Sequence, residues 1–413
     1  MTPAGSTEST VPPIEAARRY YSDSYATTFA SRVIEVTAIG NRPAAVLEES
    51  FFYPTSGGQP FDGGTLGDRR VIDVLIRETD HAVVHVLDGP LAVGPVEGRI
   101  EWPRRIDHMQ QHTGQHVLSQ AMIRVADAAT IGFHLGTAYV SIDLDAADLD
   151  ERRRDEAFAM ANEVVSRDVA VKAWFPTAEE LAAISLRKAP EVEGALRVVA
   201  IGDFDVSACG GTHVARTGEV GLIHCLKTER LTRGTRVHFL AGGRARRDYS
   251  EKQAIVSRLS AALSCAVADL PASFDRIQAE LVALRRELAR HEEDALDREA
   301  GRLAEAASGP SGRQIVRQFL PGRSVDAIKG LALRLTAVAG RIALLATTGE
   351  RTQFVFARSD DVTADLKRAL DQALAAIGGG KGGGTRVVQG GGAAAAPETV
   401  ERALDLARAA IET

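Results

Sequence analysis

Cysteine is scarce in this sequence. The 413 residues include three cysteines, Cys209, Cys225 and Cys265. A scaffold held together by disulfides would need an even and denser set, so the count excludes that class of protein. It indicates instead a reducing compartment, and we predict a cytoplasmic location.

Long hydrophobic runs are missing as well. The sequence has no uninterrupted apolar stretch of about 18 residues, so we predict no transmembrane helix and no membrane partner. The N-terminal stretch MTPAGSTESTVPP is small and polar and lacks the apolar segment of a secretory signal. We predict that residues 1–19 form a disordered tail.

An excess of basic charge is also absent. The formal net charge is −6, so any contact with RNA would have to come from local basic patches. Hydrophobic residues make up 45% of the chain and charged residues 25%, which is typical of a globular protein.

The hydrophobic patterns predict an α+β protein with four ordered regions. Residues 20–102 contain runs such as SRVIEVTAIG and RRVIDVLIRE, which favour a small antiparallel β-barrel or sandwich. Residues 103–248 mix helices, expected near 107–126 and 149–167, with strands such as TAYVSIDLD, and indicate an α+β core.

Residues 249–310 predict a helical connector, and residues 311–413 a C-terminal α/β domain. Apolar residues of the connector recur at steps of three and four, which fits either a helical hairpin or a short coiled coil; they are Phe274, Ile277, Leu281, Leu284 and Leu288. A homodimer through the connector or the C-terminal domain is therefore possible.

The stretch HMQQHTGQH places His108, His112 and His116 at steps of four. Two histidines at that spacing share a helix face and can bind one metal ion. The two pairs overlap, and spacing alone does not rank them. A metalloprotease is disfavoured, because HTGQH lacks the glutamate of H-E-x-x-H.

A second motif, CGGTH, supplies Cys209 and His213. Glycines 210 and 211 allow the tight turn that lets both side chains converge. Either motif alone could be structural. Together they offer imidazoles and a thiolate, a donor set suited to tetrahedral Zn²⁺.

HTGQH followed about 90 residues later by CGGTH resembles the editing domain of alanyl-tRNA synthetase and its free-standing relatives, the AlaX proteins. Three further stretches agree in the same order: FFYPTSGGQPFDGGTL at 51–66, TIGFHLG at 130–136 and GGGKGGGTRVVQGGG at 378–392. The resemblance runs from about residue 20 to the end and is to the long AlaX form. The synthetase's amino-acid-activating and tRNA-recognition domains have no counterpart, so the resemblance implies editing in trans.

The resemblance implies one Zn²⁺ per chain, bound by His112, His116, Cys209 and His213. It assigns no role to His108, which we expect at the helix start or on the surface. The implied reaction is hydrolysis of the ester in mischarged tRNA(Ala), chiefly seryl-tRNA(Ala) and in some cases glycyl-tRNA(Ala). Zinc could activate water or position the substrate, and four protein ligands favour positioning. We name no general base.

Rejection of alanine requires a hydrogen-bond partner for the serine hydroxyl, since an apolar pocket discriminates poorly. Several family-matched residues could contact the substrate, with an arginine near the ribose or a terminal phosphate; they are Gly57, Gly58, Gln59, Gln115, His134 and Arg236. Each could instead be a structural polar residue or, in SGGQP, part of a simple turn.

The C-terminal glycine-rich stretch carries Lys381 and Arg386. Exposed backbone N–H groups beside positive charge suit contact with the tRNA backbone, although a flexible linker has the same composition. It is not a phosphate-binding Walker A loop, because Gly382 follows the lysine. Two alternatives stay open: a threonyl-type editing domain, and a zinc-stabilised RNA-binding protein without catalysis.

Overall fold

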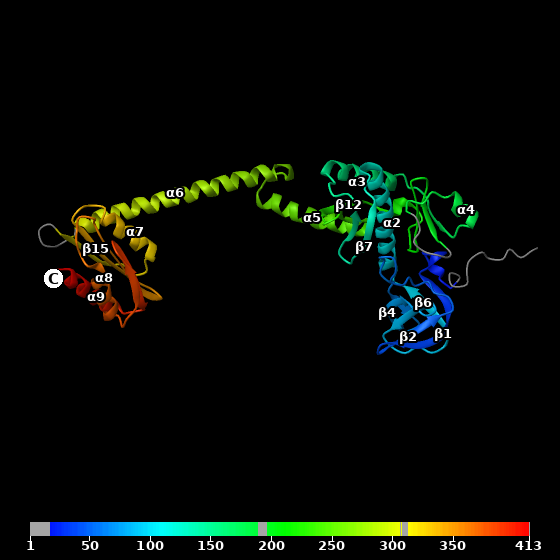
Figure 1. The fold of residues 1–413 in the computed structure, drawn as a ribbon, viewed down its shortest axis with the longest axis horizontal. Coiled ribbons are helices and arrows are strands. Elements are labelled where there is room, and N and C mark those ends of the chain that lie inside the picture. The colour runs from blue at the N-terminus through cyan, green and yellow to red at the C-terminus, as the bar shows by residue number, and fades with distance from the viewer. Residues whose placement is uncertain (1–16, 189–195, 306, 308–312, 413) are drawn as a thin grey trace, which may run out of the picture. The chain divides into compact units, whose positions relative to one another are not determined.

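The computed structural model describes residues 17–188, 196–305, 307 and 313–412 (Figure 1). The chain forms two compact units, Met1–Leu259 and Ser260–Thr413, which are described separately. Most of the expected disordered tail, residues 1–19, lies outside the described residues.

The first unit begins with a closed six-stranded barrel in the order β1-β2-β5-β4-β3-β6. Its strands are β1 (Thr28–Ile39), β2 (Arg42–Leu47), β3 (Gly64–Leu66), β4 (Arg69–Ile76), β5 (Val83–Leu87) and β6 (Gly94–Ile100). All neighbouring strands pair antiparallel, and β1 closes on β6, which leaves no free sheet edge. The predicted barrel is confirmed. Val33, Phe52, Leu66 and Val74 fill its core.

Helix α2 (Trp102–Ala126) leaves the barrel directly after β6. It starts five residues before the predicted residue 107, because Pro103 lies in the first helical turn, where proline's missing N–H costs nothing. Arg105 fixes the helix to the barrel. Its Nε lies 3.0 Å from both carboxylate oxygens of Asp62, and its other nitrogens donate to the carbonyls of Ser24 and Phe51.

The α+β core that follows contains two antiparallel sheets. The larger has the order β12-β13-β8-β7, with β7 (Thr130–Leu135), β8 (Val140–Leu144), β12 (Ile223–Arg230) and β13 (Thr235–Ala241). Ile142 and Val237 face Leu118 of α2 and Phe158 of α3 (Glu151–Ser166) in one core. The smaller sheet has β9 (Val171–Trp174), β10 (Val198–Ile201) and β11 (Asp205–Ala208), and helix α4 (Ala178–Ala183) lies between β9 and β10 in the chain.

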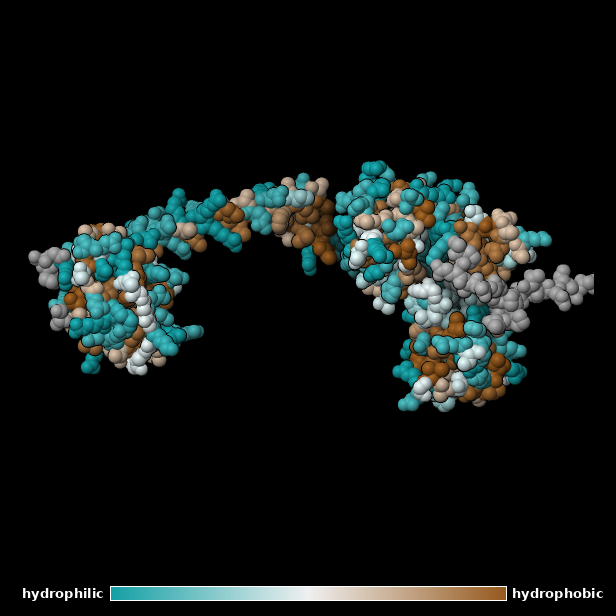
Figure 2. Space-filling view, viewed as in Figure 1, coloured by the Kyte–Doolittle hydropathy of each residue, from teal (hydrophilic) through white to brown (hydrophobic). Residues whose placement is uncertain are grey.

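Helix α5 (Gly242–Ala262) contains the boundary between the two units, after Leu259, and α6 (Leu270–Glu305) belongs to the second unit. The apolar positions of the predicted heptads on α6 are exposed, from 41% for Leu281 to 60% for Leu288. Figure 2 shows hydrophobic patches among mainly hydrophilic residues along this helix. Among described residues, no single helix is long and apolar enough to cross a membrane; the bent pair Gly242–Ala262 and Val267–Glu305 passes that test by length and composition only.

The second unit centres on a five-stranded sheet, β14-β15-β16-β18-β17. The strands are β14 (Gln314–Phe319), β15 (Arg341–Thr348), β16 (Arg351–Arg358), β17 (Lys381–Gly384) and β18 (Val387–Ala393). Helix α7 (Val325–Leu335) packs on one face, and α8 (Leu366–Ala376) and α9 (Pro397–Glu412) on the other (Figure 1). The glycine-rich stretch expected as a loop is instead the hairpin of β17 and β18.

Candidate metal centre

Four predicted side chains converge in the first unit. His112 and His116 lie one turn apart on α2, and Cys209 and His213 lie in the loop after β11. Their ligand atoms all lie within 4.8 Å of one another. The Cys209 Sγ lies 3.4 Å from His112 Nε2 and 3.3 Å from His213 Nε2. Tetrahedral Zn²⁺ would place a sulfur and a nitrogen ligand about 3.5 Å apart, so the group can hold a metal ion.

Each imidazole is held through Nδ1, which leaves Nε2 for a metal. The partners are Gln59 Oε1 at 2.8 Å from His112, Thr113 Oγ1 at 3.1 Å from His213, and Ser207 Oγ at 2.9 Å and Asp205 Oδ2 at 3.3 Å from His116. Such partners fix the ring orientation and the position of the ring proton in metal-binding histidines. The centre is therefore built as a ligand set and is more than a chance cluster of histidines.

Gln59 joins the barrel to this centre. The side chain is fully buried, and its Oε1 accepts from His112 Nδ1–H and from the Thr212 backbone N–H at 3.2 Å. Its Nε2 donates to Thr212 Oγ1 at 2.8 Å. The amide of this predicted substrate residue is thus committed to holding the ligand His112 and the loop that carries two further ligands, Cys209 and His213.

The neighbouring glycines let chain segments approach closely. Gly58 has a φ of +83°, and a Cβ there would lie 2.9 Å from the ring of Phe133, which stacks on His112. Gly57 also has positive φ but faces open space. In the cysteine loop, a Cβ at Gly211 would lie 2.1 Å from His112 Cε1, so only glycine fits beside that ligand.

Arg197 shapes the loop that carries Cys209. The buried guanidinium donates to the carbonyl oxygens of Cys209 at 3.1 Å and Gly211 at 2.8 Å. It also lies over the ring of Tyr21, 5.1 Å from the centroid. These contacts hold the loop backbone in the shape that turns Cys209 toward the histidines.

The protonation states favour metal binding at Cys209 and His213. Burial would raise the pKa of the Cys209 thiol, but His112 and the other two imidazoles hold that pKa well below its ordinary value. Burial lowers the pKa of His213 to about 3, despite the opposing effect of the thiolate. A thiolate and a neutral imidazole are the forms that bind a metal.

His116 differs from the other two histidines. Burial would lower its pKa, but Cys209 and Asp205 raise it above the ordinary value. Its Nδ1 faces the Asp205 carboxylate, which also lies 3.3 Å from Arg187 Nη1. A metal ion would therefore displace a proton most directly at this ligand.

His108 lies outside the ligand cluster, one turn before His112. The prediction of a surface histidine is wrong, because the residue is 3% exposed and occupies the second turn of α2. Burial, reinforced by Arg104, lowers the pKa of His108 to about 4. Only the pair His112 and His116 contributes to the metal centre.

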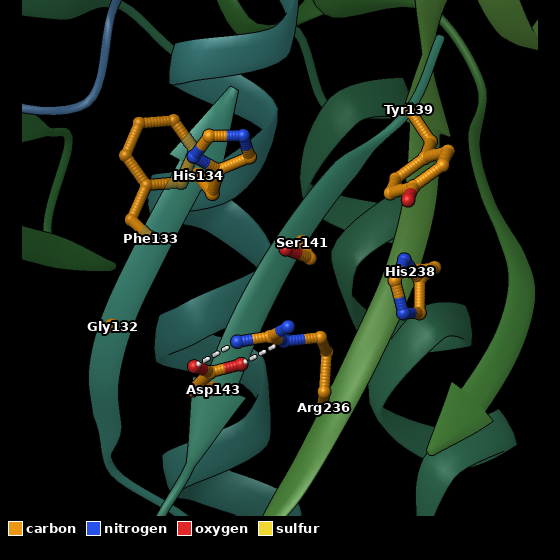
Figure 3. Close-up of a pocket in the computed structure, with 8 residues that line it drawn as sticks. All are labelled: Gly132, Phe133, His134, Tyr139, Ser141, Asp143, Arg236 and His238. Carbon is orange, nitrogen blue, oxygen red and sulfur yellow. Dashed lines mark hydrogen bonds and ion pairs between the residues drawn. The ribbon is translucent and has the colours of Figure 1, made fainter. Parts of the chain in front are cut away.

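Arg236 and His134 line a separate cavity on the larger sheet (Figure 3). In β8, Ile142 faces the core beneath α2, so its neighbours Ser141 and Asp143 point to the opposite face, where this cavity lies. Arg236 forms two hydrogen bonds with Asp143, at 2.6 and 2.8 Å. These two predicted substrate residues are not among the contacts of the metal ligands.

Gln115 lies on α2 beside the metal centre and is 5% exposed. Its Nε2 donates to Ser119 Oγ at 2.8 Å, and Thr130 donates to the same oxygen. Among the described residues, no group donates to Gln115 Oε1. The amide oxygen is therefore free to accept a hydrogen bond from a ligand.

The predicted nucleic-acid contacts lie in the second unit. Lys381 is exposed on β17 and lines a cavity of about 500 Å³ together with Arg351 and Gln389. Arg386 follows in the hairpin turn, with its Nη1 3.2 Å from Asp360. The hairpin thus presents both basic side chains on its surface.

Several residues that hold the ligands were missed in the sequence. Asp205, Ser207 and Cys209 recur at every second position, which places them on one side of a strand and could have revealed the first two. Thr113 follows His112 inside the histidine motif. Arg197 carried no comparable signal, because its contacts depend on how the loop folds back.

Comparison with known proteins links this site to tRNA synthetases. Residues 196–237 match the family model described as the "Threonyl and Alanyl tRNA synthetase second additional domain". Alanine–tRNA ligase of Pyrococcus abyssi is 35% identical over 292 residues, covering 66% of this chain and 31% of the ligase. The alanyl-tRNA editing protein AlaX-L of Pyrococcus horikoshii is 32% identical over 244 residues, covering 55% of this chain and 58% of AlaX-L.

The chain therefore spans less than two thirds of either relative. A solved structure, the C-Ala domain from Aquifex aeolicus alanyl-tRNA synthetase, aligns with 26% of this chain and 98% of that domain at 19% identity. Its TM-score of 0.24 is too low to carry an argument about the fold.

Proposed function

We propose, from the premise that this chain belongs to the AlaX-type editing proteins related to alanyl-tRNA synthetase, that it is an aminoacyl-tRNA deacylase of the cytoplasm. Its substrate is mischarged tRNA(Ala), chiefly seryl-tRNA(Ala), with glycyl-tRNA(Ala) as a further substrate. The reaction is hydrolysis of the ester between the amino acid and the terminal ribose. The oxygen of water bonds to the acyl carbon as the bond from that carbon to the ribose oxygen breaks. The amino acid leaves as a carboxylate, one proton of water goes to the ribose oxygen to restore its hydroxyl, and the other is released.

The observation that carries this proposal is the ligand set with its three anchored imidazoles. A thiolate and three imidazole donors suit one Zn²⁺ per chain, bound by His112, His116, Cys209 and His213. When bound, the metal would supply a Lewis acid, which could accept the lone pair of the substrate's neutral amino group or polarise the ester carbonyl. With four protein ligands, we assign it to substrate positioning.

The residues around the centre hold the ligands in place. Gln59, Thr113 and Asp205 keep each Nδ1 occupied, so the three Nε2 atoms point to one place. Phe133 covers one face of His112 and excludes water from that side. Gly58 is part of this arrangement, since its lack of a side chain admits the Phe133 ring.

For selectivity, we assign the serine hydroxyl to Gln115 Oε1. The position beside the metal centre, the low exposure and the free amide oxygen support this choice. Alanine would leave that oxygen unpaired in the closed site, which costs about 1–3 kcal/mol. Gln115→Leu should therefore reduce the ratio of the seryl-tRNA(Ala) hydrolysis rate to the alanyl-tRNA(Ala) hydrolysis rate about tenfold or more, and zinc content should stay unchanged.

Contact with the rest of the tRNA is assigned to the second unit, through Lys381 and Arg386 on the β17–β18 hairpin. The exposed apolar stripe of α6, which includes Leu281 and Leu288, supports self-association of two chains. Sedimentation of the wild type and of Leu281→Glu tests self-association through α6. If the wild type is a monomer at micromolar concentration, this self-association is contradicted.

The test of the function is release of serine from seryl-tRNA(Ala) by the zinc-loaded protein. Cys209→Ala should abolish both zinc binding and serine release, and its circular dichroism should remain that of a folded protein. A protein that binds zinc and tRNA but leaves seryl-tRNA(Ala) intact would be an RNA-binding protein without this activity. Hydrolysis of seryl-tRNA(Thr) in preference to seryl-tRNA(Ala) would indicate the threonyl-type specificity.

A further inference from the structure

A second cavity, of about 400 Å³, is lined in part by His108, which lies one helical turn before the metal ligand His112. Its walls come from the barrel, the start of α2, the turn between β7 and β8, and the start of α5, all within the first unit; the lining residues include Pro60, Arg104, Asp107, His108, Gly136, Arg244 and Arg247. We call it the arginine cavity. His108 and the ligand His112 are separated by about 6 Å along the helix axis, at 1.5 Å per residue.

Arg244 forms part of the cavity wall through an ion pair, whereas Arg104 and Arg247 have no carboxylate partner among the described residues. Arg244 is 8% exposed, contacts both carboxylate oxygens of Asp107 and donates to the Gly136 carbonyl at 2.7 Å. Arg104 donates through its Nε to the Phe61 carbonyl at 2.8 Å and lies over the Phe61 ring, 4.9 Å from the centroid. Arg247 is exposed and forms no ion pair with any described residue. Two guanidinium groups thus lack a carboxylate partner.

The carboxylate of Glu101 also lines the cavity and is not paired with an arginine. The lining groups without an ion pair therefore carry two positive charges and one negative charge, and this net positive charge favours an anion. Guanidinium groups bind phosphate oxygens through several N–H donors at once. Arg104 and Arg247 approach the cavity from different helices, α2 and α5. They can therefore contact one phosphate from two sides.

His108 gives an independent sign of a ligand. It is 3% exposed and lines the arginine cavity, and its Nδ1 has no hydrogen-bond partner among the described residues. A buried polar atom without a partner is uncommon and calls for a bound group. On α2, His108 lies one turn after Arg104 and one turn before the metal ligand His112.

We infer that the arginine cavity binds the phosphate on the 5′ side of the substrate's terminal nucleoside, while the aminoacyl ester lies at the metal centre. This inference rests on the proposed deacylase function. His108, which lines the cavity, lies one helical turn from the ligand His112. A single nucleoside, which links its 5′ phosphate to its acylated ribose hydroxyl, can span from the cavity to that ligand. The cavity thereby recognises a nucleotide backbone independently of the base.

Two minimal substrates test the inference: 3′-O-seryladenosine with and without a 5′-phosphate. The wild-type protein should hydrolyse the phosphorylated ester with the higher kcat/KM. Arg247→Ala should lower kcat/KM for that ester about fivefold, the effect of removing one exposed charge contact, and leave the phosphate-free ester unchanged. Arg104→Gln should act in the same direction.

Arg246→Ala is the matched control. Arg246 is the adjacent arginine of α5, is also exposed, and does not line the cavity. Its substitution should change hydrolysis of neither ester. Zinc content, measured for each variant, should stay at the wild-type value, which separates loss of phosphate binding from damage to the metal centre.

Equal kcat/KM for the two esters in the wild type would overturn the inference and leave the deacylase function standing. An equal loss on both esters in Arg247→Ala would also overturn it. If neither ester nor seryl-tRNA(Ala) is hydrolysed, the proposed function fails. Titration calorimetry with adenosine 5′-monophosphate and adenosine then decides the cavity alone: the inference requires tighter binding of the monophosphate, weakened by Arg247→Ala.

Discussion

Replacement of Gln59 by leucine tests how the barrel supports the metal centre. The substitution removes the partners of three buried groups: His112 Nδ1–H, the Thr212 backbone N–H and Thr212 Oγ1. The two Thr212 groups lose their partner with or without metal, so they lower stability and leave affinity unchanged. The His112 group matters for affinity, because a metal on Nε2 requires the proton to stay on Nδ1.

An unpaired donor in the metal-bound state costs about 1–3 kcal/mol. The expected result is zinc affinity about 10- to 100-fold weaker than in the wild type, the usual effect of removing such a partner. Competition with a chromophoric chelator measures the zinc Kd. Denaturant unfolding in the presence of excess chelator measures the separate loss of stability in the metal-free protein.

Gln111→Leu is the matched control. Gln111 is also a fully buried glutamine, and its amide forms two hydrogen bonds with the Ala241 backbone, both at 2.9 Å, and none with a metal ligand. It should lower stability to a similar extent and leave the zinc Kd at the wild-type value. Equal zinc affinity in the Gln59 and Gln111 variants would refute the role given to the Gln59–His112 hydrogen bond.

Three further predictions concern separate parts of the chain. His108→Ala should retain zinc and His116→Ala should lose it, as measured by metal analysis; the opposite result would shift the ligand set by one turn. Burial lowers the pKa of His85 from 6.5 to about 4. As the pH falls, the histidine therefore takes up a proton in the unfolded chain before it does so in the folded protein, and the free energy of unfolding decreases from about pH 6.5 toward pH 4. Denaturant unfolding measures the difference in free energy of unfolding between the wild type and His85→Gln. This difference should change by about 2 kcal/mol, against the wild type, between pH 7 and pH 5, and a constant difference would contradict this pKa. Lys381→Ala with Arg386→Ala should weaken tRNA binding and reduce the slope of log affinity against log salt by about 1.5, with zinc content unchanged; an unaltered slope would remove the hairpin from the interface.

The candidate ligands could be predicted because their spacing is local, but the choice of His112 and His116 over His108 and His112 came from the family resemblance and not from the spacing. The histidine pair needs only a helix, and Cys209 with His213 needs only a tight glycine turn. The contact between Gln59 and His112 spans 53 positions and depends on how the barrel packs against α2, which no local pattern records. For the same reason, the sequence could not show that Arg236 is paired with Asp143 on the far face of the sheet.

Two errors of secondary structure have plain physical causes. From the sequence, the helix is expected only from about residue 107 because Pro103 marks a region boundary, although proline is well tolerated in the first turn of a helix. The stretch around Lys381 has the composition of a flexible linker, because glycines have no side chains that could show the alternating pattern of a strand. In the structure, a Cβ at Gly382 would lie 2.5 Å from the Cα of Gly390, so these glycines permit a hairpin whose strands approach closely.

The most direct test of the central claim is a deacylation time course with the zinc-loaded protein on seryl-, glycyl- and alanyl-tRNA(Ala). We predict rapid release of serine, release of glycine as well, and alanyl-tRNA(Ala) spared by at least about tenfold relative to the seryl ester. Hydrolysis of alanyl-tRNA(Ala) as fast as seryl-tRNA(Ala), or of none of the three, would contradict the account.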